Sequence, residues 1–292
     1  MTMRRVGGRV AGGEAVLITG CSSGIGRAAA SALAESGFTV FATVRRESDA
    51  ESLRGLNLPG LVPVRPVDLA DPEDASQAAA FVAAELGRRG KNGLYALVNN
   101  AGAGRPAPVE LLPLAELHTE LRARVLGPLA LVQGLLPLLR RAGGRIVWIM
   151  TPALVPMPYV ASIHACDFAV NLIARTLDIE LKAWRIPNIM IRCGGIRTPA
   201  GLRTASDVEA VLRNGPADRV ALYDGALRKW AKDMASFDGK RTDAGKVAEV
   251  LVRALTARKP SRRYSVGHMA KAAAFLELLP QPLTDRILRR RF

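Results

Sequence analysis

Short apolar runs alternate with helix-like segments from residue 14 to about residue 265. The runs with strand character lie at residues 15–19, 40–44, 61–67, 94–98, 145–150, 188–191 and 264–266. The segments with helical spacing lie at residues 25–36, 48–55, 71–86, 115–141 and 160–183. Strands that alternate with helices usually pair in parallel and are covered on both faces, so this order predicts an α/β fold. We expect a doubly wound parallel sheet of about seven strands, with helices on both faces.

The chain has 292 residues and contains no linker, repeat or low-complexity segment, so we expect a single domain over residues 1–292. The core of this domain spans about residues 12–267. Residues 196–240 break the alternation with helical patches that carry aromatic side chains. Such folds bind ligands beyond the carboxyl ends of their strands. We therefore predict a lid at residues 196–240, followed by a C-terminal helical extension at residues 268–292.

Basic residues give the chain a net charge of +15 and a pI near 10.6. Many of them gather at the two ends of the chain, at Arg4, Arg5, Arg9, Arg286, Arg289, Arg290 and Arg291. Such a charge suits nucleic acids, anionic lipids or phosphorylated cofactors. Aromatic residues make up only 5% of the chain and no nucleic-acid module is recognisable, so we expect no nucleic-acid partner. We favour a solvated arginine-rich surface over contact between the C-terminal helix and a membrane surface.

The most apolar segment, residues 126–139, is short for a membrane-spanning helix and contains Gln133, so we expect a buried helix there. The first twenty residues lack the apolar run of a secretory signal. The three cysteines, Cys21, Cys166 and Cys193, have neither metal-ligand nor CxxC spacing. We therefore predict no metal site and a reducing, cytoplasmic location.

The first strand is followed by TGCSSGIG, residues 19–26, which opens the first helix. A glycine-rich turn between a strand and a helix can hold a pyrophosphate at the helix N-terminus. One glycine allows the tight turn, the second lets the backbone approach the phosphates, and the third lets the helix pack on the strand. The predicted cofactor-binding residues of this loop are Gly20, Ser22, Ser23, Gly24, Ile25 and Gly26.

Three further motifs follow in order: Asp68 within VDLAD, the segment NNAG at residues 99–102, and CGGIRT at residues 193–198. Together with the TGxxxGxG spacing, these motifs resemble the short-chain dehydrogenase/reductase family over about residues 12–267. The resemblance implies a Rossmann-like fold and a homodimer or homotetramer. The segments TGCSSGIG, FATVR and RYSVG are most similar to the hydroxysteroid and retinol dehydrogenase branch of the family.

The resemblance also assigns roles to these motifs. Asp68 takes the position that contacts adenine, and Thr198 takes the position that holds the nicotinamide carboxamide. In the CGGIRT segment, cysteine replaces the proline of the family. The NNAG segment supports the sheet and lines the ribose of the adenosine through Asn100, Ala101 and Gly102.

The second strand ends in VFATVRR, which places Arg45 and Arg46 where an NAD site would carry a carboxylate. A guanidinium binds a phosphate through two parallel hydrogen bonds and stays charged. We therefore predict NADP(H) as the cofactor, with Arg45 and Arg46 at its 2′-phosphate.

The catalytic positions of the family are altered in this chain. The resemblance implies a tyrosine acid, a lysine four residues later that lowers the tyrosine pKa, a serine at the substrate carbonyl, and an asparagine that holds a water. Alignment on the flanking segments GRIVWIMT and FAV places Thr151 at the serine, Ile163 at the tyrosine, Asp167 at the lysine and Arg124 at the asparagine. Isoleucine has no proton to give, and an aspartate does not lower the pKa of a neighbouring acid as a cation does.

A register shifted by one residue would place His164 at the tyrosine and Phe168 at the lysine, so it does not restore the pair either. Tyr159 is followed four residues later by Ile163, not by lysine. His164 and Tyr159 remain alternative proton donors, the first by its pKa near neutrality and the second by reaching in from the loop. Burial at a helix interface is the favoured explanation for His164.

We expect Arg124 and Asp167 to face one another and to form an ion pair in place of the lysine and the water. Asp167 could also accept hydrogen bonds from the nicotinamide ribose. Three functions follow for an NADP(H)-binding protein of this kind. The first is a repurposed enzyme that cyclises or isomerises a bulky apolar small molecule without hydride transfer. The second is an NADPH-dependent reductase of a reactive carbonyl or iminium with displaced acid groups, among them Thr151. The third is a non-catalytic NADP(H) sensor or partner subunit.

Overall fold

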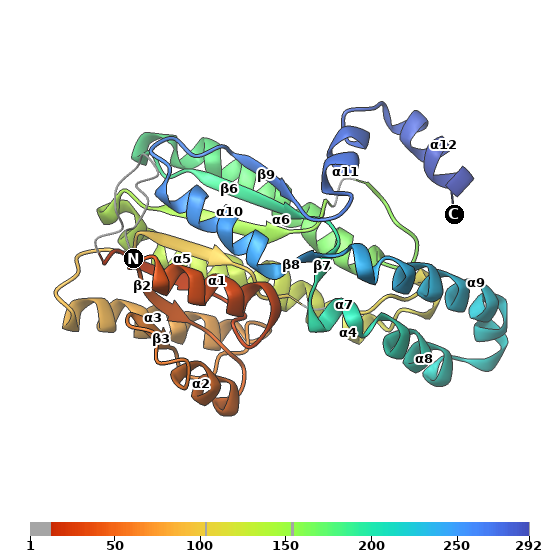
Figure 1. The fold of residues 1–292 in the computed structure, drawn as a ribbon, viewed down its shortest axis with the longest axis horizontal. Helices are drawn as coiled ribbons and strands as arrows, with labels where there is room; N and C mark the ends of the chain where they lie inside the picture. Colours follow the sequence, from red (N-terminus) through yellow and green to blue (C-terminus); the bar gives the residue numbers. More distant parts are fainter. Residues whose placement is uncertain (1–12, 103, 153–154, 292) are drawn as a thin grey trace.

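The computed structural model describes residues 13–102, 104–152 and 155–291. A seven-stranded sheet runs through its centre (Figure 1) in the order β3-β2-β1-β4-β5-β6-β9, and every pairing in it is parallel. The strands are β1 (Ala15–Ile18), β2 (Thr39–Ala42), β3 (Leu61–Pro63), β4 (Ala96–Asn99), β5 (Arg145–Met150), β6 (Asn188–Cys193) and β9 (Arg263–Val266). The predicted doubly wound parallel sheet is confirmed.

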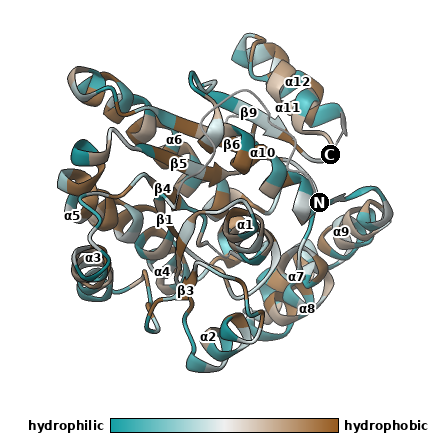
Figure 2. Ribbon diagram, turned by 60° about the vertical axis from the view of Figure 1, so that its left-hand side comes forward, coloured by the Kyte–Doolittle hydropathy of each residue, from teal (hydrophilic) through white to brown (hydrophobic). Residues whose placement is uncertain are grey.

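Helices cover both faces of this sheet. On one face lie α1 (Gly24–Glu35), α2 (Glu47–Arg54) and α10 (Ala244–Thr256), and on the other lie α3 (Pro72–Arg88), α5 (Gly127–Ala142) and α6 (Ala161–Glu180). Successive strand residues point to opposite faces of the sheet. Leu17 therefore packs on the side of α3, α5 and α6, while Val16 and Ile18 pack on the side of α1, α2 and α10. Figure 2 accordingly shows hydrophobic strands at the centre of the molecule and helices with mixed hydropathy around them.

The helix predicted over residues 115–141 is interrupted. It consists of α4 (Leu114–Leu121), a π-helical turn at Arg122–Leu126, and α5, in which Pro128 has no N–H to donate four residues back, to Arg124. By length and composition, residues 114–142 could also cross a membrane. However, Leu131, Leu135 and Leu139 are fully buried beneath the sheet, so we interpret α5 as a core helix.

The third strand is shorter than predicted and ends at Pro63. Val64 still donates to the carbonyl oxygen of Ala42 at 2.9 Å, and two residues later Pro66 has no N–H with which to continue the ladder. Residues 196–240 contain α7 (Pro199–Leu202), α8 (Thr204–Asn214) and α9 (Ala217–Ser236), which project from one end of the sheet (Figure 1). They lie between two short strands that pair with each other, β7 (Ile196–Arg197) and β8 (Thr242–Asp243). That this helical region acts as a lid stays a prediction.

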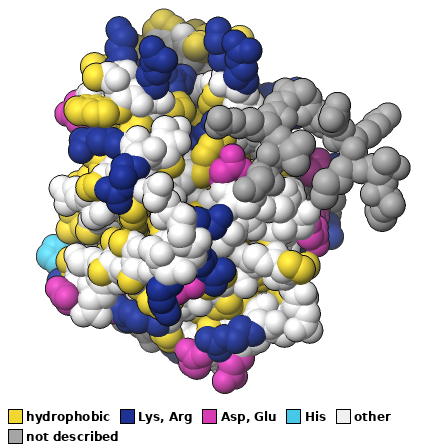
Figure 3. Space-filling model, turned by 90° about the vertical axis from the view of Figure 1, so that its left-hand side faces the viewer, with side chains coloured by type: hydrophobic (Ala, Val, Ile, Leu, Met, Phe, Trp, Pro, Cys, Tyr) yellow, Lys and Arg dark blue, Asp and Glu magenta, His cyan; other side chains and the backbone are white. Residues whose placement is uncertain are grey.

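The C-terminal extension consists of α11 (Ala270–Leu276) and α12 (Gln281–Arg291). Arg192 of β6 forms a buried ion pair with Glu277, which attaches the extension to the sheet. The basic residues of the N-terminal end, Arg4, Arg5 and Arg9, lie outside the described residues. On the face drawn in Figure 3, basic side chains are spread among hydrophobic and uncharged ones.

Candidate active site

A cavity of about 680 Å³ opens at the carboxyl ends of β1, β2, β4 and β5. Strand ends of an open parallel sheet form a crevice at this place, where the loops diverge. The predicted site residues that line the cavity are Gly20, Ser22, Ser23, Gly24, Ile25, Gly26, Arg45, Asp68, Asn100, Ala101, Gly102, Arg124, Thr151 and Thr198. Arg46, Tyr159, His164 and Asp167 are not among the described residues that line it.

The glycine-rich loop has the geometry that a bound phosphate requires. Gly20 and Gly24 have positive φ angles of 72° and 55°, which a residue with a Cβ rarely adopts. A Cβ at residue 26 would overlap the carbonyl oxygen of Gly20 and lie 2.6 Å from the Nδ2 of Asn100. Helix α1 begins at Gly24 and has no acidic residue in its first turn, so its first N–H groups can donate hydrogen bonds to an anion.

The end of β4 is fixed to the end of β1 through Thr19, which sequence reasoning did not single out. The backbone N–H groups of Asn100 and Ala101 both donate to the Thr19 hydroxyl, at 2.9 Å each. The Asn100 side chain also donates to the carbonyl oxygens of Thr19 and Gly20, at 2.8 and 3.2 Å. These bonds hold the loop and the NNAG segment together as one wall of the cavity.

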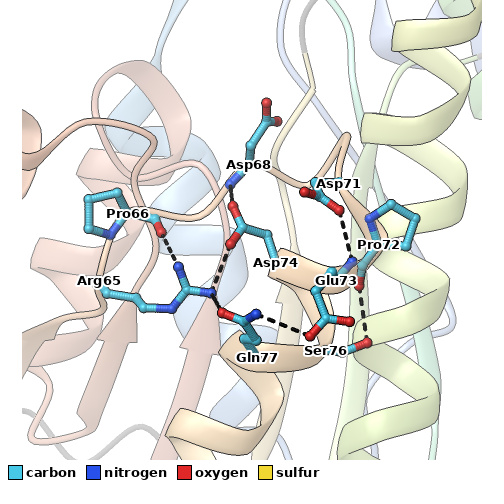
Figure 4. A network of polar contacts seen from close by, with 9 residues as sticks. All are labelled: Arg65, Pro66, Asp68, Asp71, Pro72, Glu73, Asp74, Ser76 and Gln77. Carbon is cyan, nitrogen blue, oxygen red and sulfur yellow. Dashed lines mark hydrogen bonds and ion pairs between the residues drawn. The ribbon is translucent and has the colours of Figure 1, made fainter.

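Asp68 lies at the rim of the cavity, where a network of carboxylates and one arginine positions it (Figure 4). Its backbone N–H donates to Asp74 at 3.0 Å, and Asp74 pairs with Arg65 at 2.8 Å. The N–H of Asp68 and the guanidinium of Arg65 together lower the pKa of Asp74. Asp71 caps α3 by accepting the N–H of Glu73 at 3.0 Å. The start of α3 thus fixes the turn that carries Asp68.

The two arginines after β2 differ in position. Both are exposed, but Arg45 lines the cavity, whereas Arg46 does not and directly precedes α2. Neither takes part in an ion pair with another described residue. A guanidinium without an internal acid is available to a phosphate, and the position favours Arg45.

At the other end of the cavity, Arg124, Thr151 and Asp167 form one network. Arg124 is ion-paired with the Oδ1 of Asp167, and the two side chains are 12% and 5% exposed. The Oδ2 of Asp167 accepts both the N–H and the hydroxyl of Thr151, each at 2.7 Å. The expected ion pair is therefore present. These contacts occupy both oxygens of Asp167. Fewer lone pairs of the carboxylate are therefore left for the predicted hydrogen bonds from the nicotinamide ribose.

The network also determines what Thr151 can do. A serine or threonine hydroxyl has one proton to donate, and that of Thr151 is directed to Asp167. The Thr151 oxygen can still accept a hydrogen bond, but a substrate carbonyl offers no donor. In this arrangement Thr151 does not polarise a carbonyl.

The remaining predicted proton donors lie outside the cavity wall. Tyr159 packs edge-on against Trp230 of α9, with ring centroids 5.6 Å apart, and adjoins the hydrophobic cluster of α8 and α9. Burial lowers the pKa of His164, and its Nδ1 is buried without a hydrogen-bond partner among the described residues. Neither residue borders the space in which a substrate would react. None of the four tyrosines in the chain is followed by lysine four residues later.

A carboxyl group that sequence reasoning missed lies beside this network. Glu120 of α4 lines the cavity and is 8% exposed, and its Oε2 is buried without a hydrogen-bond partner among the described residues. Its Oε1 accepts the N–H of Arg105 at 3.4 Å. Burial raises the pKa of Glu120; the nearby Ser162, the Arg105 N–H and the charge of Arg124 oppose this effect, and Glu116 adds to it. The sequence did contain a signal for it: Glu120 precedes Arg124 by four residues, and residues at this spacing lie on the same face of a helix.

The comparisons with known proteins agree with this geometry. The model of the short chain dehydrogenase family matches residues 14–208. The chain is 33% identical to 11-beta-hydroxysteroid dehydrogenase type 2 of Homo sapiens, over 94% of this chain and 69% of that protein. It is 31% identical to retinol dehydrogenase 5 of Homo sapiens, over 94% of this chain and 87% of that protein. A third relative is 3-amino-tetrahydro-pyrrolizinone reductase of Xenorhabdus hominickii, at 29% identity over 88% of each chain.

Solved structures share the fold. A short-chain dehydrogenase from Streptomyces avermitilis superposes with a TM-score of 0.71 at 24% identity, over 95% of this chain and 97% of that one. A short chain dehydrogenase from Burkholderia cenocepacia in complex with NADP has a TM-score of 0.71 at 22% identity, over 94% and 98% of the two chains. With the matched family model and the relatives above 30% identity, the conclusion is that this chain belongs to the short-chain dehydrogenase/reductase family, near its hydroxysteroid and retinol dehydrogenase branch.

Proposed function

We propose that this chain is an NADP(H)-binding enzyme that converts a small molecule without net hydride transfer, by isomerisation or cyclisation. One observation carries the proposal: the Arg124–Asp167–Thr151 network closes the catalytic end of a cavity whose cofactor end keeps the required geometry. The predicted assignment of Ile163 and Asp167 to the tyrosine and lysine positions supports it. The network supplies neither a proton donor nor a carbonyl-polarising hydroxyl for the usual reaction.

The residues of the cofactor end fit NADP(H). The glycine backbone and the start of α1 would hold the pyrophosphate, Asp68 and the NNAG segment would hold the adenosine, and Arg45 would hold the 2′-phosphate. When bound, a nicotinamide cofactor would supply or accept a hydride. The residues of this chain that line the rest of the cavity would bind and orient a substrate and shield it from water, which can itself lower a barrier.

The wall of the cavity suggests an amphipathic substrate rather than a purely apolar one. Apolar contacts come from Met150 and Pro199, while Glu116, Thr119 and Arg203 bring polar atoms to the same space. We therefore narrow the predicted substrate class, a bulky apolar molecule, to molecules with an apolar body and at least one polar group, a carbonyl or a nitrogen.

A second candidate is the NADPH-dependent reductase of a reactive carbonyl or iminium. It is favoured by the relatives, which are named as dehydrogenases and reductases, one of them for an amino-substituted pyrrolizinone. The non-catalytic sensor has no observation of its own in its favour. An assembly through the long helices also stays a proposal, supported by the exposed apolar side chains Phe168, Leu172 and Ile179 of α6.

Two measurements test the proposed function. Calorimetric titration with NADPH, NADP⁺ and NADH should show tight binding that depends on the 2′-phosphate, and absence of binding would overturn both enzyme functions. The NADPH-loaded protein is then mixed with three reactive carbonyl probes: 9,10-phenanthrenequinone, an α-diketone and an aromatic aldehyde. We expect no protein-dependent loss of NADPH with the wild type. Catalytic oxidation of NADPH would favour the reductase instead.

A matched variant shows whether the fold itself could still support the redox reaction. The triple change Ile163→Tyr, Asp167→Lys and Arg124→Asn rebuilds the family set around Thr151. We expect this variant, and not the wild type, to oxidise NADPH with the same probes. Its folding is checked by circular dichroism and thermal unfolding before the assay.

A further inference from the structure

The side chain of Ile163 and the carboxyl group of Glu120 meet at the same place. The Glu120 Oε2 and the Ile163 Cδ1 each lie 2.9 Å from the point that a Cβ at residue 104 would occupy. Gly104 has no Cβ, and this is what leaves room for both groups. A carboxyl oxygen therefore reaches the neighbourhood of the position where the alignment predicts the tyrosine acid of the family.

Glu120 borders the cavity, and its contacts with hydrogen-bonding groups of the protein are the N–H of Arg105 at Oε1 and the nearby Ser162. It lines the cavity together with Gly104, Arg124 and Thr151, and its Oε2 is unpartnered among the described residues. Arg124 does not neutralise it by an ion pair, because the charge of Arg124 is paired with Asp167. A buried, unpaired carboxyl group is costly, so its position calls for a ligand or a proton.

We propose that Glu120 is the proton-transferring group of this site and acts on a carbonyl or imine of the substrate. The proposal rests on the proposed function and deepens it, because it names the acid and the reaction class. Arg124 lies close enough to influence Glu120, and its Nε is buried without a hydrogen-bond partner among the described residues. That N–H can donate a hydrogen bond to the substrate oxygen or nitrogen that receives the proton.

The reaction class follows from a single acid that is regenerated. The O–H of protonated Glu120 gives its proton to the carbonyl oxygen or imine nitrogen, and a new O–H or N–H bond forms. The resulting carboxylate removes a proton from the adjacent carbon, and the C–H electron pair becomes a C=C bond. Glu120 returns to its protonated form, and no electrons leave the substrate. The net reaction is a keto–enol or imine–enamine isomerisation.

The groups around Glu120 favour its protonated form, which this task requires. Burial keeps the pKa of its carboxyl above the usual value, and the half-buried Glu116 one turn earlier acts in the same direction. Ser162, the N–H of Arg105 and the charge of Arg124 limit the rise. A general acid is most effective when its pKa lies near the working pH.

The test is hydrogen exchange in D₂O, followed by NMR. The probes are α-tetralone, trans-1-decalone and 2-methyl-1-pyrroline, each incubated with the protein in the absence and in the presence of NADPH. The wild type should exchange the hydrogens next to the C=O or C=N group faster than buffer. Glu120→Gln should lower this rate by about 10²-fold or more, the usual contribution of a general acid. Glu120→Asp, which keeps an acid on a shorter chain, should retain part of the rate.

Controls separate chemistry from folding. Glu51→Gln removes an exposed carboxylate of α2 that does not line the cavity, and it should leave the exchange rate unchanged. Calorimetry should show that Glu120→Gln binds NADPH as the wild type does, and thermal unfolding should show that it is folded. A merely structural role of Glu120 would lower stability without removing exchange.

The outcomes distinguish this inference from the proposed function. Exchange that persists in Glu120→Gln, or a wild type no faster than buffer, overturns the role of Glu120. Exchange that depends on Glu120 while NADPH is consumed with the ketone keeps this role but overturns the non-redox function. Exchange that depends on Glu120 with NADPH unchanged supports both.

Discussion

The two ends of the cavity are built by different means. At the cofactor end, the glycine loop and the NNAG segment present backbone atoms, and Thr19 accepts three hydrogen bonds from the NNAG segment, two at its hydroxyl and one at its carbonyl oxygen. At the catalytic end, chemistry depends on side chains, and Arg124, Thr151 and Asp167 satisfy one another. Backbone contacts survive most substitutions, whereas side-chain chemistry changes with each one. A family fold can therefore keep its cofactor geometry while its reaction changes.

The largest expected effect comes from breaking the network at the catalytic end. Asp167→Asn or Arg124→Gln should each lower the free energy of unfolding by about 3–5 kcal/mol, because each leaves a buried charge without its partner. The double variant should lose less than the sum of the two, since it removes both charges. Denaturant titration measures all three.

An exposed pair is the matched control for this experiment. Glu47→Gln breaks the ion pair with Arg54, whose side chains are about half exposed, and should cost about 1 kcal/mol or less. Simple additivity of Asp167→Asn and Arg124→Gln would contradict a coupled network.

The second effect concerns the cofactor end alone. Gly26→Ala places a Cβ against the Gly20 carbonyl and the Asn100 amide, and such overpacking costs about 1–3 kcal/mol. NADPH binding should weaken by about 10- to 100-fold, measured by calorimetry. Gly87→Ala, in α3 with no neighbour within 4 Å of a new Cβ, should leave binding unchanged. Equal loss in both variants would show that the glycine loop does not hold the cofactor.

The third effect distinguishes two cofactors. Arg45→Asp should weaken the binding of NADPH by about 10- to 100-fold, because a charged hydrogen bond contributes about 1.5–3 kcal/mol. NADH has no 2′-phosphate, so its affinity should change little in calorimetric titration. Arg46→Asp should have the smaller effect, since Arg46, unlike Arg45, is not among the described residues that line the cavity. Equal losses for NADPH and NADH would remove the assignment of a 2′-phosphate site.

The smallest effect is a dependence of stability on pH. The raised pKa of Glu120 means that, above the ordinary glutamate pKa of about 4.3, the folded protein holds a proton that the unfolded chain has lost. The stability of the wild type should therefore fall as pH rises from there through the folded pKa of Glu120. The difference in stability between Glu120→Gln and the wild type should be smallest at low pH and should grow across this window, in favour of the variant. A difference that does not change with pH would contradict a raised pKa.

The sequence predicted the fold and the cofactor end in some detail because both are encoded locally. Each strand is a short apolar run, and TGCSSGIG carries its turn chemistry within eight residues. The ion pair of Arg124 with Asp167 was also predictable, because the family alignment brought two distant positions together. Glu120 was missed because its burial depends on Gly104, Ile163 and the helix face together. The π-helical turn was missed because hydropathy does not reveal a change in backbone hydrogen bonding.

The hydrogen bonds of Asp167 bear on the order in which this site could have evolved. If an ancestor carried the lysine of the family at position 167, an arginine at position 124 would have faced a second buried cation. Aspartate at position 167 would instead have found two ready donors, the N–H and the hydroxyl of Thr151. The order of substitutions that costs less stability thus begins with Asp167 and adds Arg124 afterwards. Along that path the aspartate would have been in place, held by Thr151, before the charge pair formed.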